Sequence, residues 1–207
     1  GTGTINGIRE FGSSGTKTIQ NNQVYNFSTT AGGAGGATFN GISLSTGTMD
    51  ISNNQVYSLN STGTTGGTGG TIAGILVSGG TASTIYKNKI YDLSTTSTNP
   101  TVSGIQTSGG TTNTVHNNII GDLRTTAANA ANPLIGLNIS GGTTANVYFN
   151  TVRLDGTSSG ALFGSSAVSV STSPTVTLRN NIFVNLSTTA GAGLAVAHRR
   201  SSSTLTS

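Results

Sequence analysis

The chain has 207 residues, of which 31 are Gly, 37 Thr and 27 Ser, and only 7% carry a charged side chain. Because soluble domains usually have about 25% charged residues and because Cys is absent, we expect neither a conventional charged-surface enzyme nor a disulfide framework or cysteine-ligated zinc. The net charge of +4 comes from scattered basic residues, which argues against a nucleic-acid partner, and no apolar run reaches the roughly 20 residues needed for membrane insertion.

A repeat runs through almost the whole chain and is anchored on one Asn per copy. The first three copies read TIQNNQVYNFSTT, DISNNQVYSLNST and TIYKNKIYDLSTT. The six anchors are Asn22, Asn54, Asn88, Asn118, Asn150 and Asn181, with spacings of 32, 34, 30, 32 and 31 residues. A fixed period of this length indicates a solenoid built from similar units.

Each copy opens with a short strand pattern that follows a Gly-Ile signature. In residues 75–77 and 137–139 the first and third positions are apolar, as in a strand with one buried face. A Ser-Gly-Gly-Thr turn follows in several copies, where Gly can adopt the positive φ of a tight corner. We expect a second polar stack at this corner, formed by Ser45, Ser78, Ser108, Ser140 and Ser171.

Two further strand patterns lie on either side of each anchor. The residue three before the anchor and the residue two after it are apolar in every copy, so we expect both to face the core. An apolar series continues three residues later, at Leu59, Leu93, Leu123 and Leu186. The stretches between copies, such as 31–40 and 63–73, vary in length, which is typical of loops on one side of a solenoid.

These patterns predict an all-β fold, a right-handed single-stranded parallel β-helix of about six coils with about 32 residues each. We expect residues 1–207 to form one repeat domain. An inward Asn at a sharp bend can bond to the equivalent Asn of the next coil, so the anchors should form a buried column. A further Gly-Leu signature at Gly193 is not followed by an anchor, so we expect the domain to be a fragment of a longer repeat protein.

The pattern G-I-x-V-S-G-G-T followed by N-N-x-I-Y-x-L-S-T-T resembles the repeats of the pectate-lyase-like superfamily of parallel β-helix proteins. The Thr/Gly-rich, charge-poor version is most similar to repetitive adhesin-like surface proteins that Bacteroidota export through the type IX system. This resemblance implies a structural or adhesive role outside the cell or on its surface. We expect a polysaccharide or surface glycan as one partner. Because neither end shows a polar cap, we also expect neighbouring repeats or a second copy to stack end to end.

Three Tyr residues share one repeat position on consecutive coils, at Tyr25, Tyr57 and Tyr91. Exposed rings stacked in this way would form a strip along which a sugar chain could lie. Packing under the adjacent loop explains the same column, and both interpretations stay open.

A polysaccharide lyase or hydrolase is the alternative function. Its candidate catalytic patch consists of Lys89, Asp92, Asp122 and Arg124. A lyase needs carboxylates for Ca²⁺ and a basic residue, whereas a hydrolase needs a carboxylate pair. The column of the two Asp residues holds small polar residues in other copies, at Asn26, Ser58 and Asn185. We therefore expect a scaffold position, with no catalytic residue, no metal site and no cofactor.

Two remaining features lie outside the Tyr column and the candidate catalytic patch. His116 and His198 have no equivalent His in other copies, so we expect surface positions. Thr pairs precede several anchors and suggest an ice-binding solenoid as a third function. Other residue types interrupt these Thr columns, at Asp50, Ala82 and Asn146.

Overall fold

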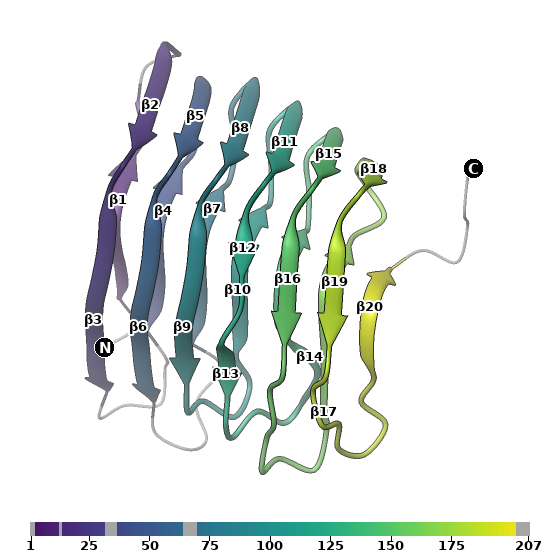
Figure 1. Cartoon of the computed structure of the whole chain (residues 1–207). Helices are drawn as coiled ribbons and strands as arrows, with labels where there is room; N and C mark the ends of the chain where they lie inside the picture. Colours follow the sequence, from purple (N-terminus) through teal and green to yellow (C-terminus); the bar gives the residue numbers. More distant parts are fainter. Residues whose placement is uncertain (1–2, 13, 32–36, 64–69, 202–207) are drawn as a thin grey trace.

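The computed structural model describes residues 3–12, 14–31, 37–63 and 70–201. These residues form twenty β-strands and no helix, and the strands make up three sheets, A, B and C (Figure 1). Neighbouring strands within each sheet are parallel. The all-β class predicted from the repeat is confirmed.

Each sheet takes one strand from every coil. Sheet A contains β1 (Thr4–Glu10), β4 (Thr38–Leu44), β7 (Thr71–Val77), β10 (Thr101–Thr107), β14 (Ala130–Ile139), β17 (Phe163–Val170) and β20 (Ala195–Arg200). Sheet B contains β2 (Thr16–Gln20), β5 (Thr48–Ser52), β8 (Ala82–Tyr86), β11 (Thr112–His116), β15 (Thr144–Tyr148) and β18 (Thr175–Arg179). Sheet C contains β3 (Gln23–Ala31), β6 (Gln55–Gly63), β9 (Lys89–Thr95), β12 (Ile119–Ile120), β16 (Thr151–Leu154) and β19 (Ile182–Asn185), while β13 (Leu123–Thr125) also pairs with β9.

One coil of the solenoid follows the sheets in the order A, B, C. In Figure 1 the chain rises along sheet A at the back, turns through sheet B at the top and descends along sheet C in front. Successive coils advance from left to right, so the winding is right-handed. Among the described residues, six coils contribute strands to all three sheets, and β20 begins a seventh. The predicted parallel β-helix is confirmed.

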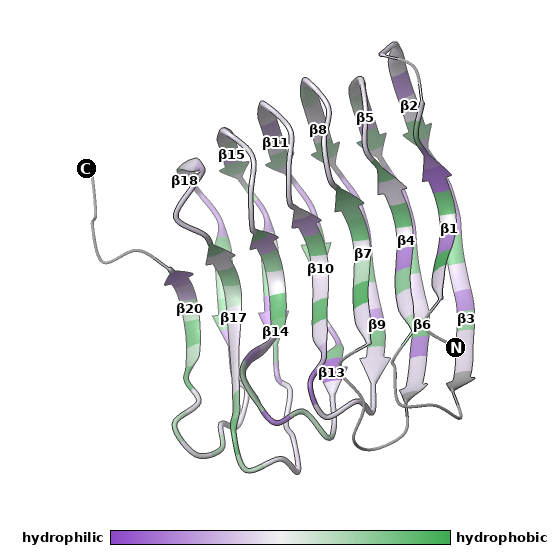
Figure 2. Ribbon diagram, turned by 180° about the vertical axis from the view of Figure 1, so that it is seen from behind, coloured by the Kyte–Doolittle hydropathy of each residue, from purple (hydrophilic) through white to green (hydrophobic). Residues whose placement is uncertain are grey.

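The core is a continuous column of aliphatic side chains that each coil extends. In sheet B, the residue three before the anchor is fully buried in the four central coils, at Ile51, Ile85, Val115 and Val147. These residues are direct neighbours in the parallel register. Figure 2 shows a similar alignment in sheet A, where apolar segments recur at the same level in adjacent strands. Each such side chain contributes about 1.5–3 kcal/mol of burial energy.

The Gly of the Gly-Ile signature allows sheet A to approach sheet C. A Cβ atom added at Gly104 would lie 2.4 Å from Cγ2 of Ile120 and 2.8 Å from the carbonyl oxygen of Gly136. Such distances are too short for non-bonded carbon atoms, so the backbone here leaves space only for the Ile120 side chain. The signature therefore marks a packing requirement between two sheets.

A kink in sheet C explains the spacing of its apolar residues. Residues three apart face opposite sides of a regular strand, yet Ile90 and Leu93 are both fully buried. Asp92 lies between them with a φ of 55°, and this left-handed residue turns Leu93 back toward the core. The same position has positive φ in each of the first four coils, at Asn26, Ser58, Asp92 and Asp122.

The sixth coil lacks this kink, and the expected place of Leu186 in the apolar series is wrong. Leu154 pairs in register with Asn185, not with Leu186. The Asn185 amide donates to the carbonyl oxygens of Ser165 (3.2 Å) and Val196 (2.9 Å). Leu186 is left 62% exposed, because no left-handed residue precedes it to shift the strand.

The six anchors form one column of hydrogen-bonded amides at the corner between sheets B and C. Asn54 Nδ2 donates to Oδ1 of Asn88 (3.0 Å) and to the carbonyl oxygen of Ile19 (2.9 Å). Asn54 Oδ1 accepts from the backbone N and from Nδ2 of Asn22, both at 3.0 Å. The Asn54 amide is thus fully paired inside the protein, as a buried amide requires. The same links continue through Asn88, Asn118, Asn150 and Asn181.

The Ser column at the corner between sheets A and B does not form the expected stack. The hydroxyls of Ser78 and Ser140 donate to the carbonyl oxygens of Leu44 (3.3 Å) and Thr107 (3.4 Å) in the preceding coil. The backbone N–H groups of the same two Ser residues donate to the same carbonyls at 2.9 Å. Adjacent coils are therefore joined here mainly by the backbone.

Asn88→Leu should lower the free energy of unfolding by about 3 kcal/mol, because it removes the two bonds that Asn88 Oδ1 accepts from the backbone N and Nδ2 of Asn54 and the bond that Asn88 Nδ2 donates to the Ile51 carbonyl oxygen. Lys87→Asn is the matched control, since Lys87 is exposed and Asn suits its φ of 54°. The control should not be less stable than the parent chain. Urea unfolding followed by circular dichroism measures both changes, and equal destabilisation would contradict the role of the column.

Candidate functional site

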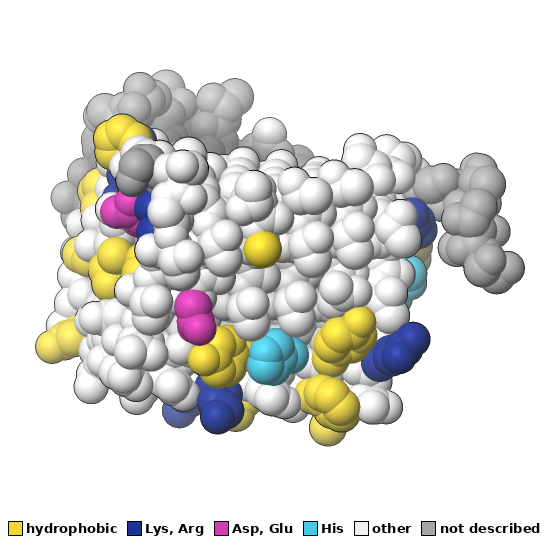
Figure 3. Space-filling view, turned by 90° about the horizontal axis from the view of Figure 1, so that it is seen from above, with side chains coloured by type: hydrophobic (Ala, Val, Ile, Leu, Met, Phe, Trp, Pro, Cys, Tyr) yellow, Lys and Arg dark blue, Asp and Glu magenta, His cyan; other side chains and the backbone are white. Residues whose placement is uncertain are grey.

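Exposed aromatic and charged side chains gather on two neighbouring surfaces. One is the outer face of sheet C, and the other is the corner where sheet B leads into sheet C. Seen from above in Figure 3, most of the molecule is neutral, while hydrophobic, His and Lys or Arg side chains lie along one margin. These two surfaces contain the described residues best suited to bind a ligand.

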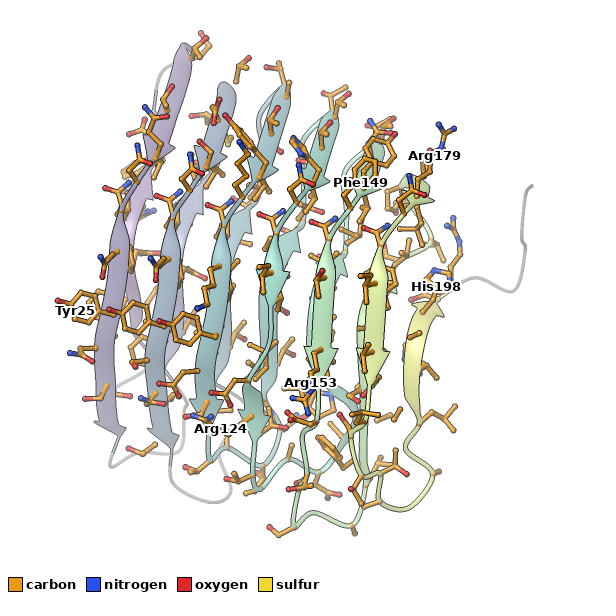
Figure 4. All side chains as sticks on the ribbon, viewed as in Figure 1. Tyr25, Arg124, Phe149, Arg153, Arg179 and His198 are labelled. Carbon is orange, nitrogen blue, oxygen red and sulfur yellow. The ribbon has the colours of Figure 1, made fainter. Side chains whose placement is uncertain are left out.

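The Tyr strip, defined as Tyr25, Tyr57 and Tyr91, lies on the outer face of sheet C. The centroids of neighbouring rings are 5.0 Å apart, with interplanar angles of 2° and 3°. In Figure 4 the strip begins at the labelled Tyr25 and crosses the neighbouring strands. The Tyr57 hydroxyl donates to Oε1 of Gln23 (3.2 Å). The parallel register thus produces a row of stacked rings with their hydroxyl groups available for hydrogen bonds.

Lys89 extends the Tyr strip and does not join the carboxylates of the candidate catalytic patch. Its Nζ atom lies 4.8 Å from the centroid of the Tyr91 ring, which is a cation–π contact. Both side chains point outward from β9, two residues apart. The strip therefore ends with a positive charge.

Asp92, Asp122 and Arg124 form an ion-paired cluster beside the Tyr strip. Arg124 pairs with both carboxylates, and the Ser58 hydroxyl donates to Oδ2 of Asp92 (2.7 Å). Both Asp residues have the left-handed backbone conformation of the sheet C kink, which Asn and Asp tolerate best. The backbone conformation is thus one reason why Asp is found at both positions.

The charge state of Arg124 follows from these contacts. Partial burial lowers the pKa of the guanidinium, but pairing with Asp122 and then Asp92 outweighs the burial and raises the pKa overall. A guanidinium held in its protonated form by two carboxylates is a poor base. Proton abstraction by Arg124 would require these ion pairs to break.

The corner strip, defined as Tyr86, His116, Tyr148, Phe149 and Arg179, is a surface that sequence reasoning missed. Tyr86, His116, Tyr148 and Arg179 occupy the same register position in β8, β11, β15 and β18. The rings of Tyr86 and His116 are stacked, with centroids 5.0 Å apart and an interplanar angle of 7°. His116 is therefore part of an aromatic row. In the sequence, these four residues each lie two positions before an anchor Asn. Because the residue type differs from copy to copy, this column was harder to recognise than the Tyr strip.

A hollow of about 280 Å³ lies at the C-terminal end of the corner strip, lined by Tyr148, Phe149, Arg179 and Asn180. In Figure 4 the labelled Phe149 and Arg179 lie near the same end of the corner. The hollow combines two rings, a guanidinium and an amide. This set of groups suits a small polar ligand with one apolar face.

Phe149 breaks the pattern of the repeat. It has a φ of 55° and is 56% exposed, although a bulky residue in this conformation costs about 1–2 kcal/mol. At the same corner position, four other coils use a residue that tolerates this φ, namely Asn21, Asn53, Asn117 and Asn180, and the third coil has Lys87 with a φ of 54°. Core packing does not explain an exposed Phe at this place.

His116 is a neutral aromatic group near pH 7. Partial burial lowers its pKa below the ordinary value of 6.5, and the nearby Lys87 charge lowers the pKa further. The neutral ring can stack on Tyr86 without adding a second cation beside Lys87. The pKa of His198 in β20 is also lowered, by burial and by Arg200.

The N-terminal end has an inward charge. Lys17 occupies the register position of Met49 in the next coil, and only 10% of its side chain is exposed. Its Nζ atom donates to the carbonyl oxygen of Thr46 (2.9 Å) and lies 3.6 Å from Oε1 of Glu10. A hollow of about 390 Å³ lies beside these groups, between β1 and β2. Inward charges on edge strands hinder pairing with another sheet.

The described part of the chain lacks two other types of feature. No group of three His, Asp or Glu side chains there is arranged to hold a metal ion. The same residues contain no helix with the length and apolar character needed to span a bilayer.

Comparison of the chain with protein-family models, with curated proteins and with solved structures gives no significant match.

Stability should decrease as the pH falls from about 7.5 to about 5. Because the pKa values of His116 and His198 are lowered in the folded chain, the unfolded chain takes up protons more readily below pH 6.5, and the free energy of unfolding falls. The double variant His116→Gln/His198→Gln should show a smaller decrease. Thermal melts across this range provide the measurement, and an unchanged pH slope in the variant would exclude this explanation.

Proposed function

We propose that the chain is a structural and adhesive module of a secreted protein on a bacterial surface, and that it binds glycans without cleaving them. The observation that carries this proposal is the type of side chain that stands out from the repeat. The outward columns that do so are aromatic rows with nearby cations, while the acids beside them are already paired. A catalytic β-helix should instead break its pattern with unpaired acids or bases.

The rod itself suits surface display. Six coils spaced at about 4.8 Å give a length of about 30 Å, with one core running through all of them. The Thr/Gly-rich repeat supports a relation to the pectate-lyase-like β-helices and to type IX surface proteins of Bacteroidota. On this basis we place the module outside the cell.

The Tyr strip gives the proposal its first binding surface. Its stacked rings offer their apolar edges to a sugar chain, and Tyr25 also offers its outer face. Gln23 and Lys89 supply polar groups beside the rings. Tyr25 is 46% exposed, so the strip is accessible at one end.

Tyr57→Ser should weaken glycan binding about tenfold, or about 1.4 kcal/mol, because it removes the ring that links the other two. Screening on a glycan array, followed by calorimetry with the best ligand, measures the effect. Gln55→Ser, two residues away on the same outer face, is the control and should retain binding. Unchanged affinity in Tyr57→Ser would remove the Tyr strip from the proposal.

A polysaccharide lyase or hydrolase is the second candidate, because Asp92 and Asp122 lie close to one Arg on adjacent coils. We expect no turnover of pectins, alginates or related glycans by the parent chain. The paired variant Asp92→Ala/Asp122→Ala provides the comparison. Robust turnover that disappears in this variant would establish an enzyme and overturn the module.

End-to-end association with a second copy is part of the same proposal. The strands β18 and β19 each have one unpaired edge among the described residues. Three core residues there are only partly buried, namely Val176, Leu178 and Phe183. The inward Lys17 disfavours strand pairing at the other end, so we expect the C-terminal end to be the more adhesive one.

Sedimentation velocity over a range of concentrations should show association of the parent chain. Val184→Lys, which adds a charge to the edge strand β19, should weaken it. A strictly monomeric parent chain at high concentration would contradict this partner.

A further inference from the structure

We propose that the corner strip is a second binding site, separate from the Tyr strip, and that its ligand is a linear polysaccharide whose sugars carry acidic groups. This proposal deepens the glycan-binding role proposed above, because it adds a site and specifies the charge of the ligand. The strip lies on the other side of the anchor from the Tyr strip, where sheet B ends.

The spacing of the strip suits a linear polymer. Tyr86, His116 and Tyr148 come from three successive coils in direct register, so the strip presents one ring per coil. The spacing of 5.0 Å between the Tyr86 and His116 rings is close to the length of one sugar unit in a β-linked chain. Successive sugars of a chain that runs along the rod would therefore meet successive rings.

The charge of the strip favours an acidic ligand. Lys87 and Arg179 are exposed, and neither forms a salt bridge within the described part of the chain. Asp50 is the acid that contacts the strip, where it accepts a bond of 3.4 Å from the Tyr86 hydroxyl. Two cations against one acid give a surplus of positive charge, which attracts anionic groups and orients them.

The hollow at the end of the strip provides a place for one sugar. Its two rings, from Tyr148 and Phe149, can contact the apolar face of a pyranose, while the Arg179 guanidinium can bond to an acidic substituent. The Asn180 amide adds a hydrogen-bonding group. The volume of the hollow, about 280 Å³, is of the size that holds a single sugar unit.

Phe149 supplies an independent reason to regard the strip as functional. An exposed ring is kept in a backbone conformation that disfavours it, at a position where Asn is used in four other coils. Strained residues of this kind are concentrated at ligand sites. The strip therefore departs from the repeat in a way that core packing does not require.

The decisive variant is Phe149→Asn, which restores the residue that the repeat uses elsewhere. It should weaken binding about tenfold while leaving the chain as stable as the parent or more stable. A loss of binding from misfolding would instead be accompanied by lower stability, so urea unfolding distinguishes the two causes. Arg179→Gln should weaken binding to a similar degree. Arg153→Gln is the charge-matched control, because Arg153 lies on sheet C and pairs with Asp155.

Affinity gel electrophoresis with three cellulose derivatives tests the ligand class. Carboxymethyl cellulose and cellulose sulfate carry different acidic groups on the same backbone, and hydroxyethyl cellulose is the neutral comparison. We expect retardation by at least one acidic polymer and little by the neutral one. The stronger of the two acidic polymers identifies carboxylate or sulfate as the preferred group.

Several results would overturn the proposal. Equal retardation by neutral and acidic polymers would remove the charge requirement, and an equal effect of Arg153→Gln would indicate non-specific attraction. Unchanged binding in Phe149→Asn, or tighter binding to single-stranded oligo(dT) than to any polysaccharide, would also contradict it. If Tyr57→Ser abolished binding of the acidic polymers while Phe149→Asn and Arg179→Gln did not weaken it, the Tyr strip would be the glycan site and the corner strip would be refuted.

Discussion

The structure depends on the hydrogen bonds between the anchor Asn side chains of successive coils. Each buried amide is satisfied only when the coils above and below place their own Asn at the same height and the same corner. Asn118 shows this clearly, since its Nδ2 reaches both Asn150 Oδ1 (2.9 Å) and the Ile85 carbonyl oxygen (2.9 Å). A slip of two residues would keep an apolar face inward, so aliphatic packing alone tolerates it better than a slip of one. The same slip would leave the Asn groups unpaired in the interior, at about 1–3 kcal/mol for each, and the column therefore fixes the register.

A fixed register has a direct consequence for the surface. Residues at equivalent repeat positions become neighbours about 4.8 Å apart, so one residue type used in several coils becomes a continuous row. Tyr25, Tyr57 and Tyr91 stack for this reason, and so do Tyr86 and His116. The same scaffold can acquire a binding surface by substitution in one outward column, with no change to the core. Both candidate sites arise in this way.

Much of the fold could be predicted from the sequence, because period, anchors and apolar positions all depend on local patterns. The place of Leu186 could not, since it depends on whether a left-handed residue precedes it. Asp92 and Asp122 provide that conformation in earlier coils, but the pattern of residue types does not reveal φ. The Ser hydroxyls likewise bond to the backbone rather than to one another.

The candidate sites were only partly visible in the sequence. The Tyr strip repeats one residue type and was easily recognised. The corner strip mixes Tyr, His, Phe and Arg, and its members become a unit only once sheet B brings the four strands together. Lys89 was grouped with the carboxylates because it is near them in sequence, yet its side chain lies over the Tyr91 ring. Which residues form one surface therefore depends on side-chain contacts, many of them between neighbouring coils, and the sequence alone does not show these contacts.

Hydrogen exchange of the Asn side-chain amides, measured by NMR on ¹⁵N-labelled protein, tests the central role of the column most directly. If the column fixes the register, the Nδ2 protons of Asn54, Asn88 and Asn118 should exchange as slowly as the backbone amides of the core strands. Asn117, which is exposed at the same corner, should exchange quickly. Exchange of the buried Asn amides at the rate of Asn117 would contradict the account, because it would show that the column opens while the coils remain stacked.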